Sequence, residues 1–146
     1  MQTGKTTRLG TIINVREIQK KQTTRELMHI SEEKKSQQEV LDKMNGEHQS
    51  AMDSTFKDSR TRASAVQTSS AFLKRLGTQI KQQTTNVKTI ESQEDVKRDE
   101  LLERSKAKTI VEKLQDKFNE ENRKEADRKE QKLIDTIGQR TMVNEA

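Results

Sequence analysis

Cysteine and proline are both absent from this chain of 146 residues, and glycine occurs only five times. The lack of cysteine excludes disulfides and thiolate chemistry. The lack of proline and the scarcity of glycine remove the residues that interrupt helices most strongly. No apolar run approaches the roughly 20 residues of a membrane-spanning helix, and we expect no signal peptide because the first residues include no apolar block.

Apolar residues are also scarce. They make up 27% of the chain, aromatic residues 2% and charged residues 36%. This is too little apolar surface for a globular core, and the composition overlaps that of disordered chains. A seam between two helices needs only about two apolar positions in seven, so the composition is compatible with a coiled coil.

The stretch from Leu27 to Ile90 shows the heptad pattern of a coiled coil. Alternating steps of three and four residues, taken forward from Leu27 and backward from Ile90, define two stripes. The stripes mirror each other, because each position of the first lies as many residues before the middle of the stretch as its counterpart in the second lies after it. Antiparallel helices with a turn between Asp58 and Ser59 satisfy this mirror relation. The sequence therefore predicts an all-α fold, a long antiparallel two-helix coiled-coil hairpin with a C-terminal helical overhang. The stripes are Leu27, Ile30, Lys34, Gln37, Leu41, Met44, His48 and Ala51 on the first helix, and Ile90, Val87, Gln83, Ile80, Leu76, Leu73, Ser69 and Val66 on the second.

We expect residues 1–146 to form a single helical hairpin. The first helix should cover about 8–56, the tip 57–62 and the second helix about 63–140, with frayed residues before Arg8. Before Leu27 the mirror relation puts charged residues on the seam, and Lys20 faces Lys97. Facing lysines repel each other, so the seam should be tight near the tip and loose or shifted near the termini.

The second helix is longer than its partner, because the mirror relation assigns residue 1 to residue 116. About thirty residues therefore form an overhang, which carries the apolar residues Leu133, Ile134 and Ile137. Both terminal segments are basic, with a net charge of +5 over residues 1–25 and +2 over residues 123–140. An apolar stripe in a basic overhang predicts an acidic external partner, although a solvated and frayed helix end would also carry such residues.

Catalytic chemistry is not expected. His29 and His48 are the only histidines, and neither has the neighbours of a metal site. A two-helix hairpin also offers no pocket in which to perturb the pKa of a carboxylate. The sequence predicts a protein that binds partners, with no enzymatic activity, no metal and no cofactor.

Both ends of the chain resemble a known family. Arg8 and Leu9, followed by VREIQKKQ over residues 15–22, are similar to the opening helix of the flagellar export protein FliJ, and RKEQKLID over residues 128–135, followed by Gln139 and Arg140, to its closing motif. Length and hairpin layout agree as well. The chain departs from the family at Thr136, where an acidic residue is usual.

The resemblance implies a role as the non-enzymatic central stalk of the flagellar type III export ATPase. The terminal helices would sit in the hexameric ATPase ring, and the hairpin would point to a membrane export gate protein at the cytoplasmic face of the inner membrane. The resemblance also implies a possible escort role for export chaperones. It assigns gate binding to Gln37, Leu41, Met44, His48, Phe72 and Leu76. It assigns ring binding to Leu9, Ile12, Arg128, Lys132, Leu133, Asp135, Ile137, Gln139 and Arg140.

Two other readings of the sequence stay open. A basic hairpin could bind nucleic acid through phosphates. Acidic residues interrupt most of the basic runs, and tyrosine and tryptophan are absent as stacking platforms, so neither nucleic acid nor a small-molecule substrate is expected. A structural coiled coil could instead dimerise into a four-helix bundle. The gate-binding positions are also ambiguous, because all of them except Phe72 lie on the predicted seam.

Overall fold

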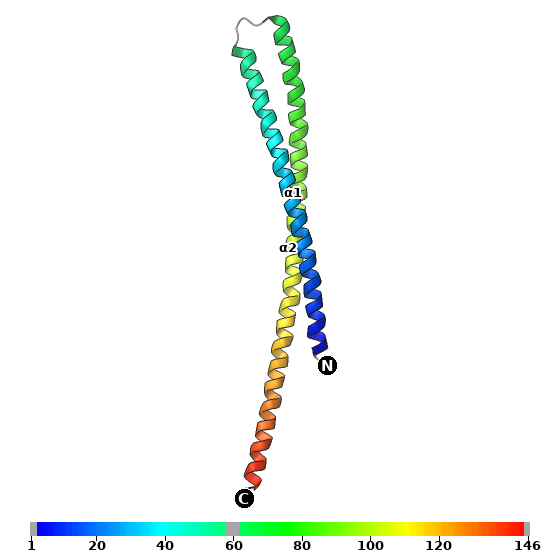
Figure 1. The fold of residues 1–146 in the computed structure, drawn as a ribbon, viewed down its shortest axis with the longest axis vertical. Coiled ribbons are helices and arrows are strands. Elements are labelled where there is room, and N and C mark those ends of the chain that lie inside the picture. The colour runs from blue at the N-terminus through cyan, green and yellow to red at the C-terminus, as the bar shows by residue number, and fades with distance from the viewer. Residues whose placement is uncertain (1–2, 58–61, 145–146) are drawn as a thin grey trace. The chain divides into compact units, whose positions relative to one another are not determined.

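The computed structural model describes residues 3–57 and 62–144 of the chain. These residues form two α-helices, α1 (Thr3–Lys57) and α2 (Ala63–Asn144), and no strand is present among them. The predicted all-α hairpin is therefore confirmed (Figure 1). The predicted turn between Asp58 and Ser59 lies outside the described residues.

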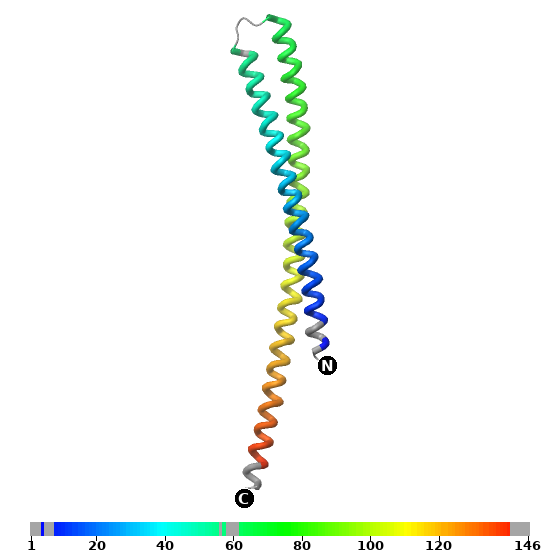
Figure 2. The backbone as a smooth tube through the Cα atoms, viewed as in Figure 1, coloured from blue at the N-terminus to red at the C-terminus, as the bar shows by residue number. Residues whose placement is uncertain are grey.

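Both helices are longer than the sequence pattern indicated. Helix α1 has 55 residues and starts at Thr3 instead of Arg8, and α2 has 82 residues and ends at Asn144 instead of Arg140. Both helices run without a break over the described residues (Figure 2). No cis peptide and no positive backbone φ angle of a non-glycine or glycine residue occurs in this part of the chain. The heptad stripe covers only the paired part of α2, so it underestimates the length of this helix, which continues beyond its partner.

The chain divides into two compact units, and the first to consider is residues 22–101. Its core is the predicted seam, where Leu41, Leu76, Val87 and Ile90 are buried. Every other described seam position is half-buried except Val66, which is exposed. Burying one such aliphatic side chain contributes about 1.5–3 kcal/mol, so these four side chains give the unit its main apolar stabilisation.

Cross-helix contacts show how the two stripes face each other. The Gln83 side chain donates hydrogen bonds to the carbonyl oxygen of Gln37 at 3.1 Å and to its Oε1 atom at 2.7 Å. The mirror relation would place Ile80 opposite Gln37, so the contact falls three positions later in α2. Helical side chains lean toward the N-terminus, which explains an offset of this direction. Sliding one helix along the other by half a heptad again places seam positions opposite seam positions. The identity of the buried residues alone therefore does not distinguish neighbouring registers.

Polar side chains are the most deeply buried groups of this unit. The side chains of Thr23 and Glu94 are only 1% and 2% exposed. The Glu94 carboxylate accepts a hydrogen bond from the Lys34 ammonium group across the seam, and its Oε1 atom lies 2.9 Å from Arg98 Nη2 on the same helix. The seam therefore continues past Leu27 with a charged layer, because that charge is paired.

The second unit combines residues 1–21 with residues 102–146. Polar contacts join its two helices: Lys108 Nζ lies 2.7 Å from Glu17 Oε2, and Arg104 Nη1 donates to the Gln19 carbonyl oxygen at 3.1 Å. From Arg123 to Arg140 every side chain is exposed, which confirms the predicted overhang of α2.

Candidate interaction surfaces

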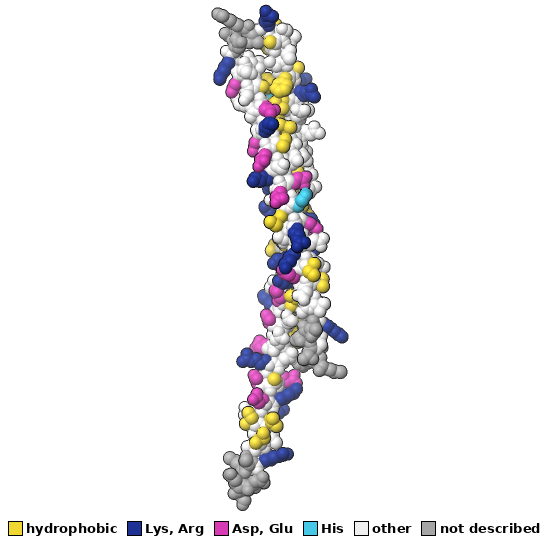
Figure 3. All heavy atoms as spheres, in the orientation of Figure 1, with side chains coloured by type: hydrophobic (Ala, Val, Ile, Leu, Met, Phe, Trp, Pro, Cys, Tyr) yellow, Lys and Arg dark blue, Asp and Glu magenta, His cyan; other side chains and the backbone are white. Residues whose placement is uncertain are grey.

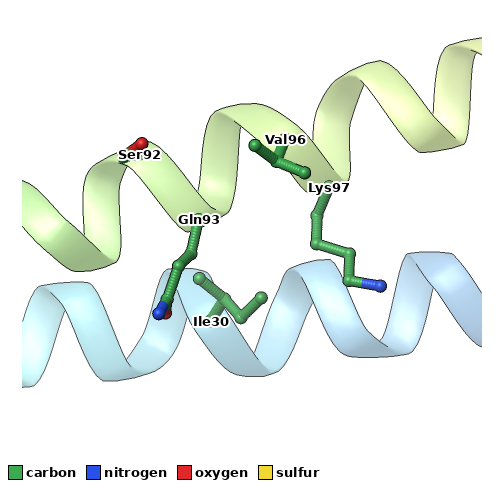
Figure 4. A pocket seen from close by; sticks show the side chains of 5 residues that line it. All are labelled: Ile30, Ser92, Gln93, Val96 and Lys97. Atoms are coloured by element: carbon green, nitrogen blue, oxygen red, sulfur yellow. The ribbon is translucent and has the colours of Figure 1, made fainter.

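The seam of the 22–101 unit leaves a shallow groove between the helices. Its volume is about 300 Å³, and Ile30, Ser92, Gln93, Val96 and Lys97 line it (Figure 4). Ile30 of α1 lies against Gln93, and Lys97 extends along the seam towards α1. The Lys97 ammonium group is held by Glu26 at 2.7 Å and by Glu100 at 2.8 Å. The only charged group of the groove is therefore already paired, so the groove is a packing feature of the seam.

Ion pairs between the helices favour the charged form of the acidic side chains that lie there. The hydrogen bond from Lys34 holds the pKa of Glu94 below its ordinary value, although burial acts in the opposite direction. The Lys97 hydrogen bond likewise lowers the pKa of Glu26. In the other unit the Lys108 hydrogen bond lowers the pKa of Glu17, and the same contact raises the pKa of Lys108. These groups stay charged at neutral pH and hold the helices together.

No metal site and no membrane span is visible in the part of the chain that the structure describes. The described residues contain no cluster of histidine and acidic side chains that could hold a metal ion. Over the same residues, neither helix has a stretch long and apolar enough to cross a membrane.

The residues assigned to gate binding differ in burial and form three groups. Leu41 and Leu76 are buried in the seam, at 7% and 5% exposure. Phe72 is 51% exposed beside the seam, so it is the one large apolar side chain of the set that is accessible to a partner. The remaining three, Gln37, Met44 and His48, are half-buried on α1.

The residues assigned to ring binding lie in the 1–21 and 102–146 unit. Leu9 is half-buried and Ile12 is 42% exposed on α1. On the overhang Leu133, Ile134 and Ile137 are 61%, 54% and 56% exposed, and Figure 3 shows hydrophobic side chains gathered near that end of α2. The other assigned residues are all exposed on α2: Arg128, Lys132, Asp135, Gln139 and Arg140.

Sequence reasoning missed the charged layer around Glu94. The mirror relation pairs Glu94 with Thr23, but we expected a charged residue on the seam only to lower the stability of the coiled coil. A signal was present, because Glu94 and Arg98 have the four-residue spacing of a helical ion pair and Lys34 lies on the facing stripe. The partner of Glu94 across the seam could not be read from spacing alone, because long side chains reach about one helical turn along the axis.

An all-α hairpin with exposed apolar and basic side chains along its helices defines a coiled-coil protein that acts through its surfaces. The family described as flagellar FliJ protein matches residues 5–146, so the chain belongs to the FliJ family. The chain is therefore a coiled-coil component of flagellar protein export and motility, and the family is not one of known enzymes. No curated protein and no solved structure matches the chain.

Proposed function

We propose that this chain is the central-stalk component of the flagellar type III export ATPase. In this role it couples the hexameric ATPase ring to the membrane export gate protein, at the cytoplasmic face of the inner membrane, and catalyses nothing itself. The observation that carries the proposal is the overhang of α2, where every side chain from Arg123 to Arg140 is exposed although the helix continues. A helix that buries nothing in its own chain is stabilised chiefly by a partner.

The chemistry of the overhang fits a ring pore. Leu133 and Ile137 are four residues apart, so they share one face of α2. The basic residues Arg128, Lys132 and Arg140 flank this face. Apolar side chains with a basic border fit an apolar groove with an acidic rim, and burial supplies most of the affinity. Leu9 and Ile12 of α1 add a second contact to the same partner in this proposal.

The gate contact in this proposal lies on the other unit. Phe72 is exposed beside the seam, and an exposed aromatic ring is a typical centre of a binding surface. Gln37, Met44 and His48 would border the contact, while Leu41 and Leu76 hold the two helices under it.

A double substitution, Leu133→Asp with Ile137→Asp, tests the ring contact. Each aliphatic side chain contributes about 1.5–3 kcal/mol when buried, so the variant should bind the cognate ATPase at least a hundredfold more weakly. The variant should also lose stimulation of ATP hydrolysis. Its thermal melting should not change, because both side chains are exposed in the chain itself.

The matched control is Val96→Asp with Ile110→Asp. These residues are 64% and 66% exposed on the same helix, and they introduce the same charge outside the overhang. The control should retain stimulation. If the overhang variant stimulates hydrolysis as well as the unmodified chain does, the overhang is not the ring contact.

A further inference from the structure

A long part of α2 carries basic residues without any acidic residue. No aspartate or glutamate occurs between Asp58 and Glu91, whereas Lys74, Arg75, Lys81 and Lys88 all lie in this interval. All four basic side chains are exposed. This part of α2 belongs to the 22–101 unit. Its positive potential is therefore not offset by neighbours on the same helix.

Three of these side chains form a straight row, which we call the lysine row: Lys74, Lys81 and Lys88. They are seven residues apart, so they recur on one side of the helix at about 10.5 Å intervals, given a rise of ~1.5 Å per residue. Each lysine lies more than a quarter turn from the seam residue before it, such as Leu73 or Ile80, and is exposed where that residue is half-buried. The lysine row therefore points away from α1.

Over the described residues the lysine row has no ionic partner, unlike five other lysines of α2: Lys97, Lys106, Lys108, Lys124 and Lys129. Further along the helix, Lys106 pairs with Glu103 at 2.9 Å, Lys124 with Glu120 at 2.6 Å and Lys129 with Glu125 at 2.9 Å. The ammonium groups of the row are thus available for an external anion.

The residues that lie beside the lysine row on the same side of the helix are small and polar. The hydroxyl groups of Thr78 and Thr85 donate to carbonyl oxygens of their own helix, at 3.0 Å and 3.1 Å. Ser70 and Gly77 are on or next to the same side and add no apolar anchor. Protein interfaces depend on such anchors, so the composition of this face does not suit a folded protein partner.

The outward side of α1 in this unit is more acidic than that of α2. Glu32, Glu39 and Asp53 keep heptad spacing and are exposed. They lie off the seam, on the side of α1 that points away from α2. Two exposed lysines, Lys35 and Lys43, also lie on this side of α1, so its charge is mixed. The outward face of α2 is therefore the more positive of the two, and an anionic surface attracts it more strongly.

We infer that the lysine row, with Arg75 beside it, docks this part of the hairpin onto an anionic phospholipid bilayer. A straight row of ammonium groups meets a plane of headgroups along its whole length, but it meets the curved backbone of a nucleic acid duplex only at separate points. Basic residues near an anionic leaflet contribute about 1 kcal/mol each, which corresponds to about fivefold in binding. This inference does not depend on the ring contact proposed above.

Vesicle sedimentation tests the inference on the full chain. The chain should bind vesicles of phosphatidylglycerol and phosphatidylcholine in equal parts, and not vesicles of phosphatidylcholine alone. Replacing Lys74, Lys81 and Lys88 by glutamine should weaken binding about a hundredfold, and high salt should have a similar effect. Glutamine is a good helix former, so circular dichroism should show an unchanged helix content.

The matched control replaces Lys106, Lys124 and Lys129 by glutamine. It removes the same three charges from the same helix, but from lysines that already pair with acidic residues. Its binding to the vesicles should stay within a few fold of the unmodified chain. If both triple variants lose binding equally, net charge alone governs adsorption and the inference is wrong.

Single labels show which side faces the bilayer, because the chain has no cysteine of its own. An environment-sensitive fluorophore on Ser70→Cys should respond to the anionic vesicles, and one on Ser50→Cys of α1 should not. Both serines are exposed. An equal response at both positions would overturn the orientation. Tighter binding to a nucleic acid duplex, lost in the Lys74, Lys81 and Lys88 variant, would overturn the lipid assignment.

Discussion

At the scale of single residues, Phe72 differs from the rest of the described surface. The chain has three phenylalanines and neither tyrosine nor tryptophan, so an aromatic ring that is 51% exposed is a rare feature here. Because the ring is exposed, it adds little to the apolar core and contributes little to the stability of the fold. The gate contact proposed above would account for that arrangement, because aromatic residues dominate the energetics of many interfaces.

Phe72→Ala should therefore weaken binding of the export gate protein at least tenfold, a typical loss for an aromatic hot spot. The free energy of unfolding should change by no more than about 0.5 kcal/mol, since the ring is exposed. Val66→Ala is the matched control, because Val66 is 43% exposed on the same helix. Calorimetric titration with the gate protein measures both variants. Equal affinity of Phe72→Ala and the unmodified chain would remove Phe72 from the gate surface.

At the scale of helices, the Glu94 layer helps to decide how α1 and α2 are aligned. Seam positions recur every half heptad, so apolar packing alone stabilises neighbouring registers almost equally. A buried carboxylate paired with Lys34 of the facing helix penalises registers that leave it without this partner, whereas its pair with Arg98 lies within α2 and is the same in every register. Polar residues at single seam positions are the best-known means of fixing the register of a coiled coil.

The pairing of Glu94 makes the stability of the hairpin depend on pH. The Lys34 hydrogen bond lowers the pKa of Glu94 in the folded protein below its ordinary value of 4.5. The stabilisation is therefore complete above that value and is lost as the pH falls through the lower pKa of the folded state. Glu26 and Glu17, whose pKa values are also lowered, act in the same direction.

Thermal melting of Glu94→Gln across the acid range measures the contribution of this layer. The variant should melt at a lower temperature than the unmodified chain at neutral pH, and the difference should shrink well below pH ~4.5 as Glu94 becomes protonated. Glu91→Gln is the control, because Glu91 is exposed less than one turn away. A constant difference at all pH values would show that the charge of Glu94 does not stabilise the fold.

The heptad pattern was sufficient to predict the fold, because the two stripes between Leu27 and Ile90 require antiparallel helices. It did not predict the charged contacts before Leu27. Lys97 was expected to face Lys20 across the seam, but its side chain reaches Glu26 and Glu100. Flexible charged side chains choose among several partners within about one turn, so sequence spacing alone does not select one. The exposure of Phe72 followed from its position one step off the stripe.

At the scale of the whole molecule, burial is concentrated in one of the two units. All the buried side chains of the described residues, Leu41, Leu76, Val87, Ile90, Thr23 and Glu94, lie within residues 22–101. The other unit is joined by half-buried side chains and by polar contacts such as Lys108 with Glu17. Local stability follows buried apolar contacts, so the two units should open with different free energies.

Amide hydrogen exchange on the isolated chain should show this difference. Exchange should be slow around Leu41 and Leu73, and fast before Thr23 and after Leu114. Addition of the export ATPase should slow exchange in the overhang, where the proposed ring contact lies. Uniform protection along both helices of the isolated chain would contradict the expected difference between the units.

The sparse apolar burial has a consequence for the effect of temperature. Four apolar side chains are buried among the described residues, so unfolding hydrates little new apolar surface. The heat capacity change on unfolding should then be smaller than the usual ~12–15 cal/mol/K per residue. A small heat capacity change flattens the curve of free energy against temperature and moves cold denaturation to lower temperatures. The hairpin should therefore keep a nearly constant margin of stability over a wide range of growth temperatures.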